Sequence, residues 1–244
     1  MHAQNSRWPL VGAVIAGALA APFAHAQACR AESGAHVPVV VELYTSEGCN
    51  SCPPADRWLS TLRDKPGVLA AAFHVDYWDR LGWKDRFASA RYAERQAQQQ
   101  AAAGTRYSYT PQVVVNGRDW RRWPDLPAAG AGAPVRLTMQ RIGEQVELQV
   151  QPVGESRQRW ALWWAALEDD HVSDVKAGEN SGVKLRHDHV VRHYGSLEPW
   201  SGALTRRVDM PQRGEGGRAL RMLAVVTDAA SGAIVQALQL RCAG

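Results

Sequence analysis

Two cysteines separated by two residues have the clearest capacity for chemistry in this sequence. Cys49 and Cys52 flank Asn50-Ser51, and this C-x-x-C spacing lets one thiolate attack a disulfide while the second thiol resolves the mixed disulfide that forms. Cys49 comes at the end of a loop and Cys52 at the start of a predicted helix, where the helix dipole and free N–H groups favour a thiolate. We therefore predict Cys49 as the exposed, attacking thiol and Cys52 as the sheltered, resolving thiol.

The first 26 residues have the pattern of a secretory signal peptide. Arg7 gives a weakly positive start, residues 8–23 are apolar and uncharged, and Ala24-His25-Ala26 has the small-x-small pattern of a cleavage site. The apolar run is shorter than the roughly 18 residues that a membrane span needs. We predict cleavage after Ala26, or alternatively after Ala28. The mature protein is then expected in the periplasm or outside a bacterial cell, with no stable membrane insertion.

Export changes how the other two cysteines are interpreted. Cys29 and Cys242 lie near the two ends of the mature chain, and an even number of cysteines in an oxidising compartment suggests disulfides. Four cysteines allow three pairings. The spacing favours a structural Cys29–Cys242 disulfide, which would constrain nearly the whole unfolded chain. The alternative is two free or separately paired thiols.

The composition is that of a globular protein. Of the 244 residues, 45% are apolar and 21% are charged, which is too apolar and too weakly charged for intrinsic disorder. The formal net charge is only +4, and the short arginine pairs are scattered along the chain. A nucleic-acid-binding protein would more often concentrate its basic residues on one face, so we predict no nucleic-acid partner.

The elements around the C-x-x-C motif must hold it at the end of a buried strand. β-Branched and apolar runs predict strands, and an Asn-Gly pair after such a run predicts a hairpin. In chain order the sequence predicts a strand at 38–44, the C-x-x-C helix at 52–62, a strand at 68–75, a helix at 87–103, Thr110-Pro111, and a hairpin around Asn116-Gly117. This is the element order of a thioredoxin fold. We predict an α/β thioredoxin-like domain over residues 27–123.

Three stretches of this region resemble a known family. They are VELYTSEGCNSCPPAD, HVDYWDRLGWKDRF and YTPQVVVNG, and GENSGVKLRHDHVVR extends the likeness into the C-terminal half. Together they resemble the exported thioredoxin-like proteins of domain-of-unknown-function family 1223. The resemblance implies a thioredoxin-like domain with a C-x-x-C motif, and it supplies no substrate. One departure is expected. Thioredoxin folds usually close with a helix after the hairpin, whereas residues 124–134 here are rich in Pro and Gly, so this helix should be short or absent.

The likeness to thioredoxin folds implies roles for two further residues, and a position after the second predicted strand suggests roles for two more. Pro111 would form a cis peptide bond and face the cysteines, and Thr110 would offer its backbone to a bound peptide. Asp76 and Trp78 follow the second strand, at the end of an α/β sheet where ligands usually bind. They are candidate substrate-binding residues, although Trp78 is alternatively plain core.

Glu42 is a candidate proton relay on the first predicted strand. It lies one position further from the first cysteine than the usual thioredoxin acid, so equivalence needs a slightly longer loop. A buried carboxylate there would have a raised pKa and would accept the proton of the resolving thiol. The alternative is a solvent-facing glutamate on an edge strand, because glutamate is rarely fully buried.

After the Pro/Gly/Ala linker at 124–134, the sequence predicts mainly short strands. They are expected at 136–139, 145–151, 160–167, 207–210, 220–227 and 234–240. Strict alternation of polar and apolar residues over 145–151 is typical of a half-buried antiparallel strand. We predict a β-rich, sandwich-like domain over residues 135–244.

Histidines in this second half suggest a metal site only weakly. His187 and His189 would point the same way on a strand, with His193 nearby, so a site is geometrically possible. Surface or domain-interface histidines are the simpler interpretation, and we predict no metal ligands. His74 alternates with Val75 in a predicted strand and is interpreted as a core histidine.

We therefore predict an exported thiol–disulfide oxidoreductase that acts on protein or small-molecule disulfides or dithiols, with an unidentified redox partner and no cofactor. One alternative is a metal- or copper-handling module in which both thiolates bind Cu(I) and either His74 or an added ligand completes the site. The other is a binding module whose C-x-x-C disulfide is structural. Thr110-Pro111 favours the oxidoreductase over the metal-binding alternative, because a proline there helps to exclude metal and to shape a peptide groove.

Overall fold

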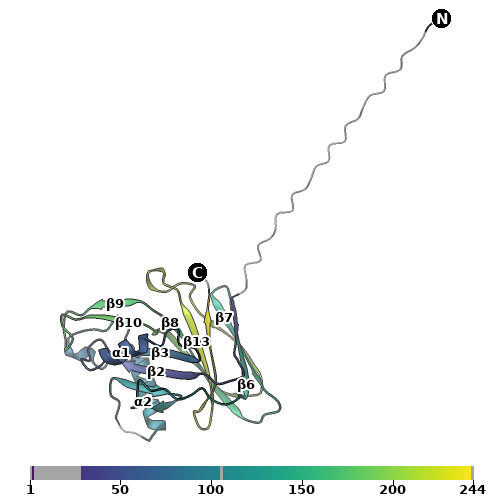
Figure 1. Cartoon of the computed structure of the whole chain (residues 1–244), viewed down its shortest axis with the longest axis horizontal. Coiled ribbons are helices and arrows are strands. Elements are labelled where there is room, and N and C mark those ends of the chain that lie inside the picture. The colour runs from purple at the N-terminus through teal and green to yellow at the C-terminus, as the bar shows by residue number, and fades with distance from the viewer. Residues whose placement is uncertain (1, 3–28, 105–106, 243–244) are drawn as a thin grey trace.

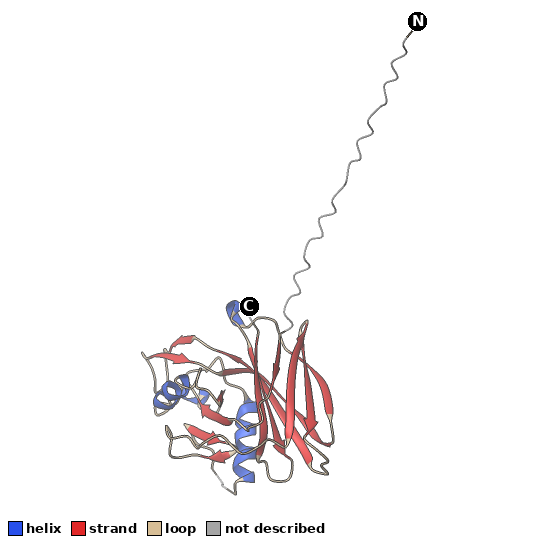
Figure 2. Cartoon of the chain, turned by 45° about the vertical axis from the view of Figure 1, so that its right-hand side comes forward, coloured by secondary structure: helices blue, strands red, loops and turns tan. Residues whose placement is uncertain are grey.

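The structure is a computed structural model that describes residue 2, residues 29–104 and residues 107–242 (Figure 1). Apart from residue 2, the predicted signal peptide lies outside the described residues. No helix in the described ranges is long and apolar enough to cross a membrane. The chain is mostly β-structure with few helices (Figure 2).

The largest element is a mixed sheet of eight strands in the order β14-β13-β8-β11-β3-β2-β4-β5. In sequence order its strands are β2 (Val39–Thr45), β3 (Val68–His74), β4 (Gln112–Val115), β5 (Arg118–Asp119), β8 (Arg159–Glu168), β11 (Val190–Ser201), β13 (Arg221–Asp228) and β14 (Ile234–Arg241). β2 and β3 are parallel. The first residue of β11, Val190, pairs in parallel with Ala72 of β3. The sheet is thus continuous across the predicted linker, and the two predicted domains share it.

Strand β2 is buried on both faces because a helix covers each of them. Its odd-numbered residues pack with Ala55 and Leu59 of α1 (Pro53–Ser60). Val40 and Tyr44 face the other way, toward Tyr92 of α2 (Ala90–Ala102). Successive side chains of a strand point to opposite faces, so a continuous apolar run is required here. Both helices and both parallel strands lie within a few residues of their predicted positions.

Four strands form a second sheet that packs on the C-terminal part of the first. They are β1 (Arg30–Glu32), β6 (Val135–Ile142), β7 (Gln145–Pro152) and β12 (Leu204–Asp209), in the order β1-β6-β7-β12. Val146, Leu148 and Val150 alternate inward from β7 and share a core with Trp160 and Met222 of the large sheet. The prediction that this half of the chain is rich in β-structure is confirmed.

The predicted Cys29–Cys242 disulfide is present, with its Cα atoms 5.4 Å apart. Cys29 precedes β1 and Cys242 follows β14. The bond therefore joins the small sheet to the large one, and both cysteines pack against the core between them.

A separate hairpin, which the sequence did not predict, projects over α1 (Figure 1). It consists of β9 (His171–Asp174) and β10 (Lys184–His187), which pair only with each other among the described strands. We call residues 171–187 the flap. Two short 3₁₀ helices, η1 (Asp79–Leu81) and η2 (Glu215–Gly217), complete the structure.

The closing helix of a thioredoxin fold has no counterpart in residues 120–134, as the proline and glycine content led us to expect. Side chains of this segment cover the sheet instead. Trp120, Trp123 and Leu126 pack on the core beneath α1, and the ring of Trp123 lies 5.5 Å from that of Trp58.

Candidate functional site

The C-x-x-C motif lies where the parallel strands end and α1 begins. Cys52 is the N-cap residue of α1, and it forms a disulfide with Cys49 across a Cα–Cα distance of 5.5 Å. Both cysteines are fully buried. The expectation of an exposed Cys49 is therefore wrong for this disulfide-bonded form, in which only the intervening Asn50 and Ser51 reach the surface.

The flap is the reason for this burial. Asn180, only 5% exposed, lies in the loop between β9 and β10. Its Nδ2 donates hydrogen bonds of 2.9 Å to the carbonyl oxygens of both Glu47 and Cys49. The Asn50 N–H donates to Oε2 of the neighbouring Glu179 at 3.2 Å. Side chains of the flap therefore fasten it to the backbone on either side of Cys49.

Opening of the flap should control access to the disulfide. Replacing Asn180 by alanine removes two buried hydrogen bonds, each contributing about 1 kcal/mol, so reduction of the Cys49–Cys52 bond by a water-soluble phosphine should accelerate about thirtyfold. Ser181→Ala is the matched control, because its hydroxyl bonds within the same loop, to the carbonyl of Lys176. The rate is measured by stopping the reaction at set times, alkylating the free thiols and counting the alkylated thiols by mass spectrometry. An unchanged rate in Asn180→Ala would show that the flap is not the barrier.

Two of the predicted substrate-binding residues meet beside the C-x-x-C turn. The indole Nε1 of Trp78 donates to the hydroxyl of Thr110 at 2.7 Å, and the Thr110–Pro111 peptide bond is cis. A Cβ placed on Gly48 would lie 3.1 Å from Cβ of Trp78, so this tryptophan packs directly against the residue before Cys49. Trp78 thus links the Thr110–Pro111 turn to the cysteine loop.

Asp76 is not part of that contact. It is half-buried just after β3, and its carbonyl accepts the Asp79 N–H that begins η1. Among the described residues it forms no hydrogen bond with Trp78 or Thr110. Its observed role is in the turn that leads to η1.

The structure does not bring Glu42 to the cysteines, which corrects its assignment as their proton relay. Its side chain leaves β2 on the face covered by α2, whereas the cysteines lie on the face of α1. Glu42 is buried, as the relay idea required, but Arg95 Nη2 donates to its Oε2 at 2.7 Å. Burial opposes the positive charge of Arg95, yet the Glu42 carboxylate raises the pKa of Arg95 above its ordinary value.

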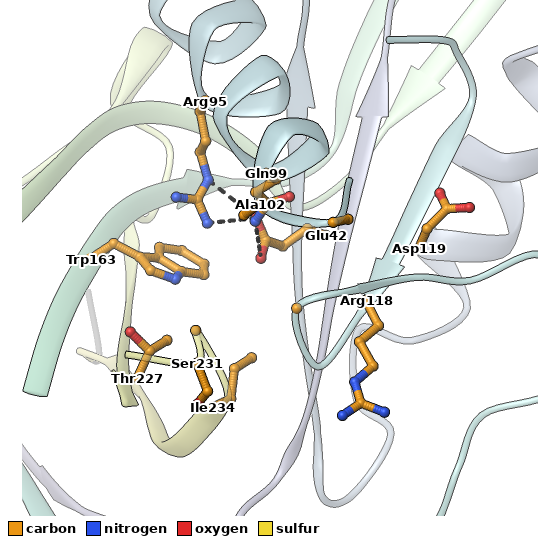
Figure 3. Close-up of a pocket in the computed structure, with 13 residues that line it drawn as sticks. Glu42, Arg95, Gln99, Ala102, Arg118, Asp119, Trp163, Thr227, Ser231 and Ile234 are labelled. Atoms are coloured by element: carbon orange, nitrogen blue, oxygen red, sulfur yellow. Dashed lines mark hydrogen bonds and ion pairs between the residues drawn. The ribbon is translucent and has the colours of Figure 1, made fainter. Parts of the chain in front are cut away.

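Glu42 and Arg95 line a pocket of about 420 Å³ between α2 and the C-terminal strands. Figure 3 shows the ion pair beside Trp163, whose ring lies 4.4 Å from the guanidinium carbon of Arg95. Gln99 also donates to both carboxylate oxygens of Glu42. The acid is thus held as the ion-pair partner of Arg95 on the face opposite the cysteines.

Directly behind the disulfide, five buried ionisable side chains gather from five different segments. They are Glu47, Asp56, His74, Asp85 and His187, and we call them the buried polar cluster. His74 ends β3, Asp56 lies one turn into α1, and His187 ends β10 of the flap. Sequence reasoning interpreted His74 as a plain core residue and gave no role to Asp56 or Asp85.

Asp85 organises one side of the cluster. Its Oδ2 lies 2.7 Å from Nδ1 of His74 and accepts the Glu47 N–H at 2.9 Å, while its Oδ1 accepts the Phe87 N–H. Burial alone would lower the pKa of His74, but the charge and hydrogen bond of Asp85 raise it above the ordinary value. Burial works against the ionised form of Asp85, and His74 holds the pKa of that carboxyl below its usual range.

Glu47 and His187 form the other side. Trp83 Nε1 donates to Glu47 Oε2 at 2.8 Å, and His187 Nε2 lies 3.3 Å from Glu47 Oε1. Burial opposes the charge of Glu47, but His187 holds its pKa below the ordinary value. The rings of His187 and His74 are perpendicular with centroids 4.9 Å apart. The flap therefore contributes one member of the cluster as well as its cover.

The three histidines that suggested a metal site do not share a face. His187 ends β10, His189 adopts a left-handed φ of 58° and His193 is exposed on β11. The idea that the first two point the same way on one strand is wrong, because the chain turns between β10 and β11. His189 instead faces Arg221 and Asp169.

Burial and the charge of Arg221 lower the pKa of His189 to about 4. An unfolded histidine titrates near 6.5. Between pH 4 and pH 6.5, His189 therefore binds a proton in the unfolded chain but not in the folded chain, and this proton binding stabilises the unfolded chain. This contribution to stability is present above pH 6.5 and is lost as the pH falls toward 4. We expect His189 to account for about 2 kcal/mol of lost unfolding free energy between pH 7.5 and pH 4.5.

His189→Asn tests this expectation, because asparagine tolerates the left-handed backbone. Urea unfolding of both proteins at the two pH values should show a smaller acid loss in the variant. An equal loss in both would assign the acid sensitivity to other groups.

Only one set of three ligand atoms within 4.8 Å of one another is found among the described His, Cys, Asp and Glu residues, at Glu168, His171 and Glu215. Two arginines already neutralise these acids. Arg86 pairs with Glu215 at 2.5 Å, and Arg192 lies 3.5 Å from Glu168. The local positive charge makes a cation site here unfavourable.

Comparisons with known proteins place these features in a wider group. A family model described as "Protein of unknown function (DUF1223)" matches residues 40–227, which contain the C-x-x-C motif, the flap and the buried polar cluster. A search of curated proteins found no match.

Two solved structures are similar to this chain. Protein AGR_C_4864 from Agrobacterium tumefaciens has 28% sequence identity and a TM-score of 0.65, over 84% of this chain and 95% of that one. HBP35 of Porphyromonas gingivalis has 15% identity and a TM-score of 0.57, over 86% of this chain and 76% of that one. At such low identity, the second likeness concerns the fold alone.

Proposed function

This chain belongs to the DUF1223 family, and we propose that it is an exported thiol–disulfide oxidoreductase in which Cys49 attacks and Cys52 resolves. The observation that carries the proposal is the position of the Cys49–Cys52 disulfide at the first turn of α1. A helix N-terminus stabilises a thiolate there. The second disulfide, Cys29–Cys242, supports an oxidising compartment.

The surroundings of the motif support a thioredoxin-like arrangement. β3, β2 and β4 are adjacent in the sheet, and α1 and α2 cover opposite faces of β2. The cis Thr110–Pro111 turn is joined to the cysteine loop through Trp78. A substrate peptide would lie against the joined Trp78 and Thr110 side chains, next to the cysteine loop.

The exchange reaction proceeds in two balanced steps. A substrate thiolate attacks Cys49 Sγ, the Cys49–Cys52 bond breaks, and its electron pair leaves on Cys52. The second substrate thiol then loses its proton and attacks the substrate sulfur of the mixed disulfide, which releases Cys49 as a thiolate. The substrate dithiol is oxidised and the C-x-x-C pair is reduced by two electrons. The reverse sequence reduces a substrate disulfide.

Access to Cys49 requires the flap to move, since both cysteines are fully buried beneath it. The polar contacts of Asn180 and Glu179 hold it closed in the oxidised form. A substrate that binds Trp78 and Thr110 would compete for the same cysteine loop and favour the open form.

Equilibration of the mature chain with mixtures of reduced and oxidised glutathione tests the proposal. We expect the Cys49–Cys52 pair to convert reversibly while Cys29–Cys242 remains oxidised, and the reduced protein to reduce a disulfide-bonded peptide. Alkylation followed by peptide mapping assigns each thiol. A C-x-x-C disulfide that stays oxidised in the folded protein under excess dithiothreitol would refute the redox function.

That result would favour a second candidate, a binding module with a structural C-x-x-C disulfide. The complete burial of both cysteines is the observation in its favour. Under this alternative the flap is a permanent cover, and Asn180→Ala would leave the disulfide as resistant to reductant as before.

A further inference from the structure

The buried polar cluster behind the disulfide is richer in unsatisfied polar atoms than packing alone requires. Three atoms of its side chains have no hydrogen-bond partner among the described residues, namely Asp56 Oδ2, His74 Nε2 and Nδ1 of His187, and the 3.3 Å contact between Glu47 Oε1 and His187 Nε2 lacks good hydrogen-bond geometry. A buried polar atom without a hydrogen bond lowers the stability of the folded chain. The concentration of such atoms in one cluster indicates that the cluster has a function, because it lowers the stability of the folded chain.

Asp56 is the member of the cluster closest to Cys52 along the chain. It lies four residues after Cys52, and its N–H donates to the Cys52 carbonyl at 3.1 Å. Residues at this spacing lie one above the other on a helix. Cys52, Asp56 and Leu59 are all buried on the side of α1 that faces the sheet. The carboxyl and the sulfur therefore share the interior face of the helix.

Charged and polar groups face Asp56 from each segment packed around it. His187 approaches from β10 and His74 from the end of β3, and the hydroxyl of Thr45 approaches from the end of β2. The carboxylate of Asp85 completes the surroundings, with Glu47 beyond His187. Two imidazoles can thus compensate a negative charge that forms on Asp56.

A cation is a poorer explanation for the cluster than proton exchange. Within the described ranges, the only three ligand atoms that come within 4.8 Å of one another are in the Glu168 group, so the cluster is not arranged as a metal site. His74 Nδ1 is already engaged with Asp85. Carboxyl and imidazole groups that contact each other, but whose ligand atoms do not converge on one point, are suited to holding and moving protons.

We propose that Asp56 gives a proton to Cys52 when the disulfide is reduced and takes it back when the disulfide re-forms, while His74 and His187 stabilise the resulting carboxylate. This inference rests on the proposed redox function of the C-x-x-C pair and adds to it the group that handles the proton.

The proton transfer completes the balance of the first step. When the substrate thiolate attacks Cys49, the electron pair of the broken bond arrives on Cys52 Sγ. That sulfur is fully buried in the closed form, which favours a neighbouring side chain over bulk water as the source of its proton. The Asp56 carboxyl donates the proton and becomes a carboxylate, and the thiol of Cys52 results. In the reverse direction the carboxylate removes the proton as Cys52 attacks the mixed disulfide. Burial raises the pKa of Asp56, while His187 and His74 limit the rise, so the carboxyl keeps its proton at higher pH than an exposed aspartate.

The direct test measures the acidity of Cys52 without any redox reaction. In a Cys49→Ser chain, Cys52 is a free thiol whose titration can be followed by the NMR signal of its labelled Cβ. Adding Asp56→Asn removes the neighbouring carboxylate, so Cys52 should become about tenfold more acidic, a pKa shift of about one unit. Asp64→Asn is the matched control, since Asp64 is exposed and pairs with Arg241. Equal Cys52 titrations with and without Asp56→Asn would overturn the inference.

A second measurement needs no substitution and guards against misfolding of the variant. In the wild-type chain, the carboxyl signal of Asp56 should titrate at a different pH before and after reduction by a phosphine, because the disulfide becomes a titratable thiol beside it. An Asp56 titration that is indifferent to the state of the cysteines would also overturn the inference.

Kinetics separate this inference from the proposed function. In the two-cysteine protein, Asp56→Asn should slow reduction by dithiothreitol about a hundredfold near neutral pH, and Asp56→Glu should restore part of the rate. If the Cys52 titrations shift as expected but neither protein exchanges with glutathione, the proton coupling stands and the oxidoreductase proposal fails. If glutathione exchange proceeds at the same rate in Asp56→Asn, the oxidoreductase proposal stands and Asp56 is not its proton donor.

Discussion

Replacement of Cys52 by serine should leave Cys49 trapped in stable mixed disulfides, whereas replacement of Cys49 by serine should abolish disulfide exchange. Cys49 precedes the first turn of α1, and the helix dipole contributes roughly 0.3–1 kcal/mol to thiolate stability at such a site. Cys52 is the N-cap residue and faces the interior beside Asp56. We expect only Cys49 to become accessible when the flap opens, and therefore only Cys49 to start the exchange.

The measurement uses glutathione disulfide and a disulfide-bonded peptide, with mass spectrometry to locate each adduct. The double variant Cys49→Ser/Cys52→Ser is the control and should form none, since Cys29 and Cys242 remain bonded. In the reduced wild-type protein near neutral pH, alkylation should label Cys49 well before Cys52. If Cys52 reacts first, or if Cys49→Ser still exchanges at the wild-type rate, the roles of the two cysteines are reversed or the disulfide is structural.

Removal of the Cys29–Cys242 disulfide should cost about 5 kcal/mol of unfolding free energy. The two cysteines are separated by 213 residues, and the entropy of the unfolded chain rises by about 5 kcal/mol at 25 °C when so long a loop is released. The bond also joins the two sheets that enclose the C-terminal core. Its removal should therefore loosen the sandwich as well as release the unfolded chain.

Urea unfolding of Cys29→Ser/Cys242→Ser measures this loss. The control is Cys49→Ser/Cys52→Ser, in which the released loop has a sequence separation of only 3 and the same entropy argument gives about 2 kcal/mol. The expected signature is a clearly larger loss for the terminal pair. Equal losses would mean that native-state packing, and not loop length, sets the contribution of each disulfide.

The local elements of the N-terminal half could be predicted because each has a signal in adjacent residues. The valine run of β2, the prolines at the start of α1 and the Asn116-Gly117 turn specify structure within a few residues. Asn116 and Gly117 indeed have the positive φ values of 51° and 78° that this turn requires. Such signals can be recognised in the sequence without any knowledge of the tertiary fold.

Long-range pairing was not predictable in the same way. β11 is the longest strand, yet it alternates poorly, has register shifts against β8, and includes Pro199 and Gly195. Its parallel contact with β3 joins segments far apart in the sequence. The flap strands pair only with each other. Each has 4 residues, which is too few for an alternating pattern to be recognised in the sequence.

The error over Glu42 has a simple physical origin. Side chains alternate across a strand, so a displacement by one residue moves a side chain to the opposite face. Glu42 was expected behind the resolving cysteine, but the position of β2 that faces α1 at that level is Thr45, the neighbour of Asp56. The acid behind the cysteines comes from the helix instead. Its spacing of four from Cys52 was visible in the sequence, but its burial depends on β10, which was not predicted.

Continuity of the large sheet makes the C-x-x-C motif inseparable from the rest of the chain. A fragment that ended at the linker would lose β11 and leave β3 as a bare edge, with unpaired N–H and C=O groups that recruit strands from other molecules. It would also lose the flap and His187, and with them the cover over the cysteines. The C-x-x-C half is therefore no portable module that can be transplanted into another protein. Protein engineering must therefore treat the two sheets and the flap as one unit.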